Sequence, residues 1–336
     1  MKSSIGFVGI GQCGGNIVEQ FEGEYNAFYI NTSLEDLQTL KSNNYYHIKE
    51  ANGSNHNRNK AINYMKNHYK DIVENILNKF NENEIIYLVF STGGGTGSGI
   101  SPLLLELLSS NCKNKVFGAV CVLPDINEPV NVQTNAYNCM IQLSKIKSIG
   151  SVFVLDNSKN NKEAVNKEFY TAFNNVINLP NYTSKKGNID TAEVKEMLSM
   201  RGIANISVFE NNDVSNIIKS LKRNCFSYQD NKKLVYMALS LKEDVDIDSL
   251  NRYVGIPYDI FTNYNTVKNT LFLSGMSFPA DRIKVIKGII DNQKKEMESI
   301  IDNSKNNHIK NELEWDVQLK NNSKPLDFSE IFQKYQ

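Results

Sequence analysis

The chain has 336 residues, of which 40% are hydrophobic and 22% are charged. Its 37 Lys and Arg balance its 37 Asp and Glu, so the formal net charge is zero. This composition excludes a disordered or collagen-like chain, and a neutral chain has no global electrostatic reason to coat DNA or an anionic membrane. No apolar run reaches the roughly 18 residues that a transmembrane helix needs.

Apolar runs in the first half of the chain predict strands, and stretches with three- and four-residue apolar spacing between them predict helices. The strands are expected at Ile5–Val8, Ala27–Ile30, Ile85–Phe90, Val116–Leu123 and Ser151–Leu155. The helices are expected at Asn16–Phe21, Asn59–Phe80, Ser101–Leu108 and Lys162–Leu179. This alternation predicts an α/β fold with a Rossmann-like parallel sheet that is covered on both faces.

The second half predicts a smaller α+β domain. Its strands are expected near Ile206–Phe209, Leu234–Leu241 and Asn269–Gly275, and its helices near Thr191–Ser199, Asp213–Phe226 and Ala280–Asp302. We therefore expect three parts. A nucleotide-binding domain at 1–180 includes the central helix, an α+β domain follows at 181–302, and 303–336 form a partly disordered tail with at most one short helix.

The first of two glycine loops spans Gly9–Asn16, between a predicted strand and a predicted helix. It has the form G-x-G-x-x-G, the dinucleotide fingerprint. Glycines let the backbone approach a phosphate, and the helix N-terminus offers free N–H groups. On its own the loop fits a tight turn without a ligand equally well.

The second loop, Thr92–Gly99, holds five glycines between a buried strand and a helix. Each glycine loses more conformational entropy on folding than other residues do, so five of them are costly. A turn needs only one or two glycines, whereas a backbone that wraps around an anion needs several. Two such loops at neighbouring strand ends favour a nucleotide with several phosphates. A NAD-dependent oxidoreductase, which needs only the first loop, is a remote alternative.

Three motifs now resemble the tubulin/FtsZ superfamily. Gly93–Gly99 is similar to its signature heptapeptide, and Gly11–Gly14 is similar to the tubulin form of its first phosphate loop. Asn188–Glu193 resembles its synergy loop, N-x-D-x-x-D, with Glu193 in place of the last Asp. The resemblance implies a self-assembling GTPase that uses GTP or GDP with Mg²⁺ and forms head-to-tail filaments.

Other stretches resemble the TubZ group of this superfamily, which segregates plasmid and phage DNA. They are Asn31–Ser33, Val122–Pro124, Leu155–Asn157 and Asn166–Phe169. The resemblance implies a DNA-binding adaptor at a centromere-like site as partner, with neither direct DNA binding nor a membrane. A cell-division GTPase of the FtsZ type and a phage-positioning tubulin remain alternatives.

The resemblance also implies which residues hold the nucleotide, with Gln12 beside the metal. They are Gly11, Gln12, Cys13, Asn16, Gly53, Gly94, Gly95, Thr96, Gly97, Ser98, Glu128, Asn157, Phe169 and Asn174. Glu128 is expected at the ribose and Asn157 at the guanine. Phe169 is expected to stack on the base, although an aromatic at helical spacing fits a core position equally well, and Asn174 is expected at the guanine edge.

By resemblance, Asn188, Asp190 and Glu193 are the catalytic residues, and they act on the GTP of the next subunit. Two carboxylates three residues apart share one helix face and can polarise a water molecule. Acidic residues in a first helical turn also favour the helix dipole, so a structural role fits them too.

The cysteines and histidines complete the expectations. The five cysteines are widely spaced with no C-x-x-C, and the four histidines show no H-x-x-x-H spacing. This pattern argues against a disulfide framework and against a zinc site. The first residues do not read as a signal peptide, so we expect a cytoplasmic protein.

Overall fold

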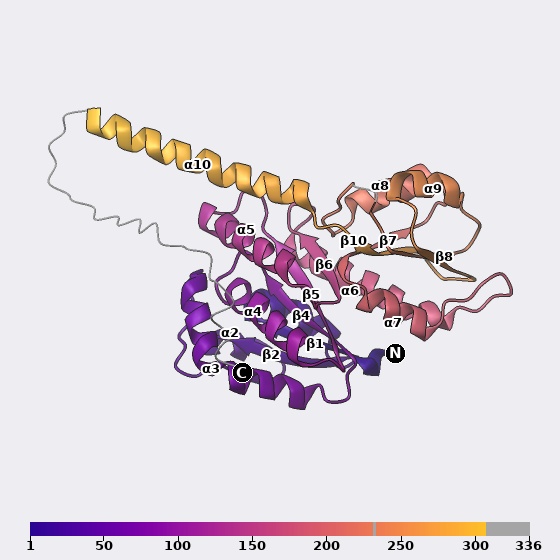
Figure 1. Ribbon diagram of the computed structural model, residues 1–336, viewed down its shortest axis with the longest axis horizontal. Helices are drawn as coiled ribbons and strands as arrows, with labels where there is room; N and C mark the ends of the chain where they lie inside the picture. Colours follow the sequence, from indigo (N-terminus) through magenta and orange to yellow (C-terminus); the bar gives the residue numbers. More distant parts are fainter. Residues whose placement is uncertain (231–232, 307–336) are drawn as a thin grey trace. The chain divides into compact units, whose positions relative to one another are not determined.

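In the computed structural model, residues 1–230 and 233–306 are described (Figure 1). Contacts divide the chain at Gln293 into two units, residues 1–293 and residues 294–336. The sheet and the candidate site described below lie in the first unit.

One 10-stranded sheet runs through this unit in the order β3-β2-β1-β4-β5-β6-β7-β10-β8-β9. Its strands are β1 (Ile5–Ile10), β2 (Asn26–Asn31), β3 (Tyr45–His47), β4 (Ile85–Ser91), β5 (Val116–Leu123), β6 (Ser151–Asp156), β7 (Gly202–Phe209), β8 (Tyr236–Leu241), β9 (Asp259–Tyr264) and β10 (Asn269–Met276). The strands from β3 to β7 pair in parallel, whereas β10 is antiparallel to both β7 and β8. The parallel sheet predicted for the first half is therefore confirmed.

The helices connect these strands. They are α1 (Gly11–Val18), α2 (Leu34–Gln38), α3 (Arg58–Lys79), α4 (Thr96–Asn111), α5 (Val130–Lys145), α6 (Lys162–Ile177), α7 (Thr191–Ser199), α8 (Val214–Arg223), α9 (Ile247–Val254) and α10 (Ala280–Asn306). Short 3-10 helices are η1 (Lys2–Ser4), η2 (Glu19–Phe21) and η3 (Leu179–Asn181). No helix within residues 1–230 and 233–306 is long and apolar enough to cross a membrane.

The core lies between the sheet and α6, the predicted central helix. Phe7, Tyr87 and Phe153 come from β1, β4 and β6, and each places its ring 5.4–5.8 Å from that of Phe173 on α6. These strand residues share one face of the sheet, because successive side chains of a strand point to opposite faces. Helix α4 packs against β4 and β5 and also contacts α3 and α5.

Several predicted bounds differ from the structure. The helix after the second glycine loop begins at Thr96 rather than Ser101, because the second half of the loop is itself helical. The sequence analysis had no element at α5, α9, β3 or β9. The predicted last helix extends to Asn306 and so includes the first four residues of the tail predicted at 303–336, whose remaining residues, 307–336, lie outside the described residues.

Parallel pairing of β6 with β7 carries the sheet across residue 180, where the sequence divides the chain. The predicted parts at 1–180 and 181–302 therefore share one continuous sheet. Their division into a nucleotide-binding and an α+β domain stays a prediction.

Candidate nucleotide site

The two glycine loops meet because β1 and β4 are neighbours, with Ile10 paired to Phe90. At these strand ends begin α1, at Gly11, and α4, at Thr96, and neither helix has a side-chain cap at its N-terminus. The first N–H groups of both helices thus lack intrahelical partners. Two positive helix ends aimed at one place form a binding site for an anion.

A cavity of about 440 Å³ opens between these helix ends. The predicted residues that line it are Gly11, Gln12, Cys13, Gly53, Gly94, Gly95, Thr96, Gly97 and Glu128. Further lining residues, which the sequence analysis did not predict, include Thr32, Asp36, Ser54, Asn55, His56 and Lys162. The structure therefore brings most of the predicted phosphate-binding residues together.

A hydroxyl network holds three loops in place around the cavity. The Thr96 hydroxyl lies 2.7 Å from that of Thr32, which follows β2, and 3.0 Å from that of Ser54, which precedes α3. Because these bonds occupy its hydroxyl, Thr96 contributes to the cavity through its backbone and through the loops that it joins. Thr32 and Ser54 stand in loops far apart in the chain, so only the fold identifies them.

The loop before α3 holds an uncommon backbone conformation at the cavity. Gly53, Asn55 and His56 have φ angles of 64°, 50° and 57°. Left-handed residues other than glycine cost free energy, and they cluster at ligand-binding sites. Asn135 of α5 fixes this loop to the second glycine loop, because its amide donates to the carbonyls of His56 and Gly93.

The far end of the cavity carries a charged pair. Glu128 and Lys162, the first residue of α6, lie 3.5 Å apart. Burial is the main cause that raises the pKa of the nearby Cys13 thiol to about 12, so that this thiol is neutral. Lys162 is the single Lys or Arg among the residues that line the cavity, so a polyphosphate there would be bound mostly by N–H groups and helix dipoles.

Oxygen donors at the cavity fit a magnesium ion that is carried by phosphates. Among the described residues, no group of three or more His, Cys, Asp and Glu could hold a metal ion. Gln12 and Asp36 line the cavity. Mg²⁺ at nucleotide sites is usually held by one or two protein ligands together with phosphate oxygens, which this donor set can supply.

Five of the predicted nucleotide-binding residues lie outside the cavity lining, and Ser98, Asn16 and Asn157 are three of them. The Ser98 hydroxyl is buried and donates to the Gly94 carbonyl, so it closes the loop instead of facing a ligand. Asn16 is exposed on α1, three residues after Cys13. Asn157 follows β6 directly, and its Oδ1 is buried without a hydrogen-bond partner in the structure.

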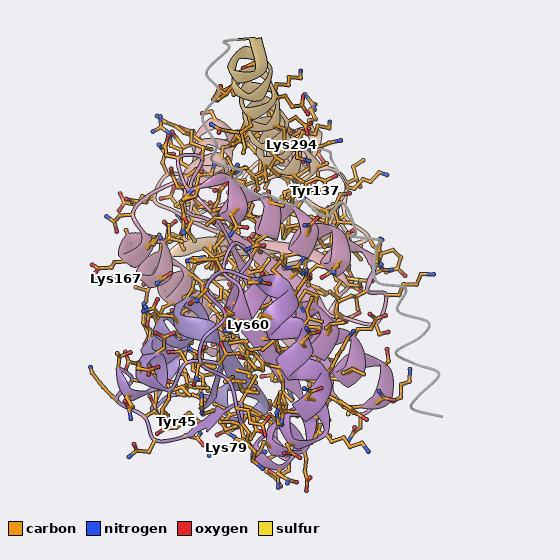
Figure 2. The ribbon with its side chains drawn as sticks, turned by 90° about the vertical axis from the view of Figure 1, so that its left-hand side faces the viewer. Tyr45, Lys60, Lys79, Tyr137, Lys167 and Lys294 are labelled. Carbon is orange, nitrogen blue, oxygen red and sulfur yellow. The ribbon has the colours of Figure 1, made fainter. Side chains whose placement is uncertain are left out.

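Two predictions on α6 are wrong. Phe169 is completely buried, with its ring 5.7 Å from both Phe21 and Phe153, so it packs in the core and cannot stack on a base. Lys167, two residues earlier, is exposed and marks the solvent side of the same helix (Figure 2). Asn174 accepts a hydrogen bond from Tyr25, and 12 residues of helix, about 18 Å, separate it from Lys162 at the cavity.

Asn188, Asp190 and Glu193 lie far from this cavity. A capping box joins the last two at the start of α7, because each carboxylate accepts a hydrogen bond of 2.8 Å from the other residue's N–H. The preceding loop lies against the edge strand β9, where Asn265 donates to the Thr183 carbonyl. α7 contacts η3, which follows α6, and the 16 residues of α6 run about 24 Å away from Lys162 at the cavity.

Figure 1 shows the same separation, with α7 on the right of the view and α2 and α4 on the left. In the capping box of Asp190 and Glu193, one oxygen of each carboxylate, Asp190 Oδ2 and Glu193 Oε1, takes no part in the two capping hydrogen bonds. These groups are not among the residues that line the cavity of their own chain.

Fold and cavity together are typical of α/β proteins that bind nucleotides at the carboxyl ends of parallel strands. A family model described as Tubulin/FtsZ family, GTPase domain, matches residues 4–164. The tubulin-like protein TubZ of Clostridium botulinum C phage is 32% identical over 358 residues, which span 100% of both chains. The chain therefore belongs to the tubulin/FtsZ family, which sets the oxidoreductase alternative aside.

Solved structures agree with this assignment. The crystal structure of Clostridium botulinum phage c-st TubZ has a TM-score of 0.82 at 33% identity and covers 88% of this chain and 100% of that one. A GTPγS-form protofilament of TubZ from Bacillus thuringiensis serovar israelensis has a TM-score of 0.79, covers 90% of this chain and 95% of that one, and shares the fold at 16% identity.

Proposed function

We propose that this protein is a GTPase that assembles into head-to-tail filaments and segregates plasmid or phage DNA. The observation that carries the proposal is the separation of two half-sites: a phosphate cavity at the ends of β1 and β4, and the Asp190/Glu193 box beyond the far end of α6. Each half is incomplete within one chain. Contact between the cavity of one copy and the box of the next would complete the site.

In this proposal the cavity holds GTP or GDP. The N-termini of α1 and α4 bind the phosphates, and the strained loop at Gly53–His56 lies where it can contact the terminal phosphate. Mg²⁺ beside Gln12 and Asp36 would neutralise phosphate charge, because Lys162 is the only Lys or Arg among the residues that line the cavity. Glu128 is proposed to accept from the ribose hydroxyls.

Guanine recognition is proposed for residues at the Lys162 end. Asn157 carries a buried acceptor without a partner in the structure, and the guanine edge has N–H donors that suit it. Asn166, half-buried on α6, is four residues after Lys162 and on the same helix face. We propose Asn166 in place of the wrongly predicted Phe169 and Asn174.

Hydrolysis is proposed to need two subunits. Asp190 and Glu193 of one copy would orient the water that attacks the terminal phosphate in the next copy, with Asn188 beside them. Asn188 Oδ1 accepts a 2.6 Å hydrogen bond from the Ser184 N–H, which fixes the approach to this box. Phosphoryl transfer depends mostly on positioning and charge stabilisation, so full deprotonation of the water is not required.

Relatives support the assembly and the DNA role. The Bacillus thuringiensis TubZ was solved as a GTPγS-form protofilament and as a two-stranded filament. The TubZ that matches the whole length of this chain comes from a phage. A DNA-binding adaptor is the proposed partner, because a chain with zero net charge has no overall electrostatic attraction to DNA.

GTP hydrolysis per molecule should rise steeply with protein concentration and then level off, because isolated copies lack half of the site. Phosphate release and light scattering, measured together over a dilution series, test this. A specific activity that stays constant through the assembly threshold would contradict the shared site.

The DNA role is tested by the rate at which cells lose a replicon that encodes the chain. If the protein segregates DNA, a replicon that encodes an inactive variant should be lost faster than one that encodes the wild type, whereas a role in cell division predicts no such difference.

A further inference from the structure

Arg282, in the first turn of α10, joins two segments that border the cavity. Its Nε donates to Asp156 Oδ2 over 2.8 Å, and its Nη2 donates to the Pro124 carbonyl over 2.7 Å and to the Ser158 hydroxyl over 2.8 Å. The side chains of Arg282 and Asp156 are only 11% and 4% exposed. We call these four residues the Arg282 clamp.

The clamp lies at the start of both loops that carry the charged pair of the cavity. Pro124 follows β5 and leads to Glu128, whereas Asp156 ends β6 and leads to Lys162. The planar guanidinium fixes several acceptors at once in a rigid geometry, which a lysine ammonium cannot reproduce. Thus a residue 120 positions after Lys162 sets the spacing of the two loops that bring Glu128 and Lys162 to 3.5 Å.

We infer that Arg282 is a positioning residue for the nucleoside half of the nucleotide site. This inference rests on the proposed function, because it assigns the Glu128–Lys162 end of the cavity to ribose and base. The phosphate half does not depend on the clamp, since α1 and α4 and the hydroxyl network at Thr96 hold it. Weakening the clamp should therefore reduce nucleoside binding and leave phosphate binding unchanged.

The test is Arg282→Lys, which keeps the charge and loses the fork of hydrogen bonds. Binding of GDP and of inorganic pyrophosphate, both with Mg²⁺, is measured by competition against a fluorescent GDP analogue. We expect GDP to bind about tenfold more weakly, as the loss of one to two hydrogen bonds implies, and pyrophosphate to bind as it does to the wild type. The matched control is Lys284→Ala on the same helix, whose ammonium contacts the exposed Asp281.

Removing a partner from a buried ion pair can prevent folding. A second variant, Ser158→Ala, removes one hydrogen bond of the clamp without changing a charge, and should weaken GDP binding about threefold with pyrophosphate unaffected. An equal loss for both ligands, or unchanged GDP affinity in folded Arg282→Lys or Ser158→Ala protein, would overturn the inference. A wild-type protein that binds no guanine nucleotide would instead overturn the proposed function.

Discussion

Gly94 and Gly95 are neighbours in the second glycine loop, but a side chain at each position would meet different surroundings. A Cβ on Gly94 would meet no atom within 4 Å and would point into open space at the cavity. A Cβ on Gly95 would lie 2.4 Å from the Ser54 hydroxyl and 2.8 Å from the Asn57 nitrogen. Gly94 thus leaves room for a ligand, whereas Gly95 allows two protein loops to approach each other.

Gly94→Ala should therefore keep the wild-type melting temperature without nucleotide and weaken GDP binding about tenfold or more, because its methyl group would occupy the space of a phosphate. Gly95→Ala should lower the melting temperature as well, since overpacking typically costs ~1–3 kcal/mol. Thermal melts and GDP titrations on both variants check this. If Gly94→Ala binds GDP as tightly as the wild type, the phosphates do not lie against this loop.

At the scale of elements, the start of α7 combines a helix cap with the proposed catalytic carboxylates. Asp190 accepts from the Glu193 N–H, as an N-cap residue does. Asp190→Ala would remove both functions at once, with a loss of about 1 kcal/mol for the cap alone. A change that keeps the cap is needed to separate structure from chemistry.

Asn caps a helix about as well as Asp, so Asp190→Asn should fold, bind GTP and assemble like the wild type. It should hydrolyse GTP at least tenfold more slowly, because the next subunit's terminal phosphate loses the carboxylate that orients water. Filaments of this variant should persist after limiting GTP, as followed by light scattering and phosphate release.

The matched control is Asp246→Asn, since Asp246 caps α9 in the same way by accepting from the Ser249 N–H. This control should assemble and hydrolyse normally. Wild-type phosphate release by Asp190→Asn would mean that Asp190 serves only as a helix cap. Glu193→Gln, which preserves the capping box, should resemble Asp190→Asn with a smaller effect.

At the scale of the whole molecule, the buried thiols make the stability of the fold depend on pH. Burial raises the pKa of the Cys139 thiol from 9.0 to about 12, and it also raises the pKa values of the Cys121 and Cys225 thiols. Between these values the folded chain keeps protons that the unfolded chain releases. Stability from these thiols is therefore complete below pH 9 and is lost as the pH rises toward 12.

The melting temperature should thus be nearly constant from about pH 7 to 8.5 and fall steadily above pH 9. Cys139→Ala removes one buried thiol and should show a shallower fall over the same range. Thermal melts in matched buffers test this. An identical slope in the variant would assign the alkaline loss to other groups, such as the buried tyrosines.

Local patterns in the sequence determined five of the six strands in the first half, all but β3, and both glycine loops. Ile85–Phe90 is apolar throughout because both faces of β4 are buried, and this is visible without a structure. Gly11 has a φ angle of 71°, which few other residues adopt, and a Cβ on Gly95 or Gly97 would lie 2.4 Å or 3.0 Å from a neighbouring side chain. Such signals need only neighbouring residues, so the sequence alone was sufficient for the fold class and for the two glycine loops that meet at the cavity.

Only the tertiary structure decided the rest. The spacing of Phe169 along α6 cannot show whether its ring stacks on a nucleotide base or packs in an aromatic core, because both partners are apolar surfaces. Its contacts with Phe21 and Phe153 assign it to the core. Thr32 and Ser54 line the cavity, and Arg282 joins two segments that lead to it, through contacts between distant parts of the chain that no local pattern encodes. The separation of Asp190 from the cavity likewise depends on the packing of α7 beside η3 at the far end of α6, which long-range contacts decide.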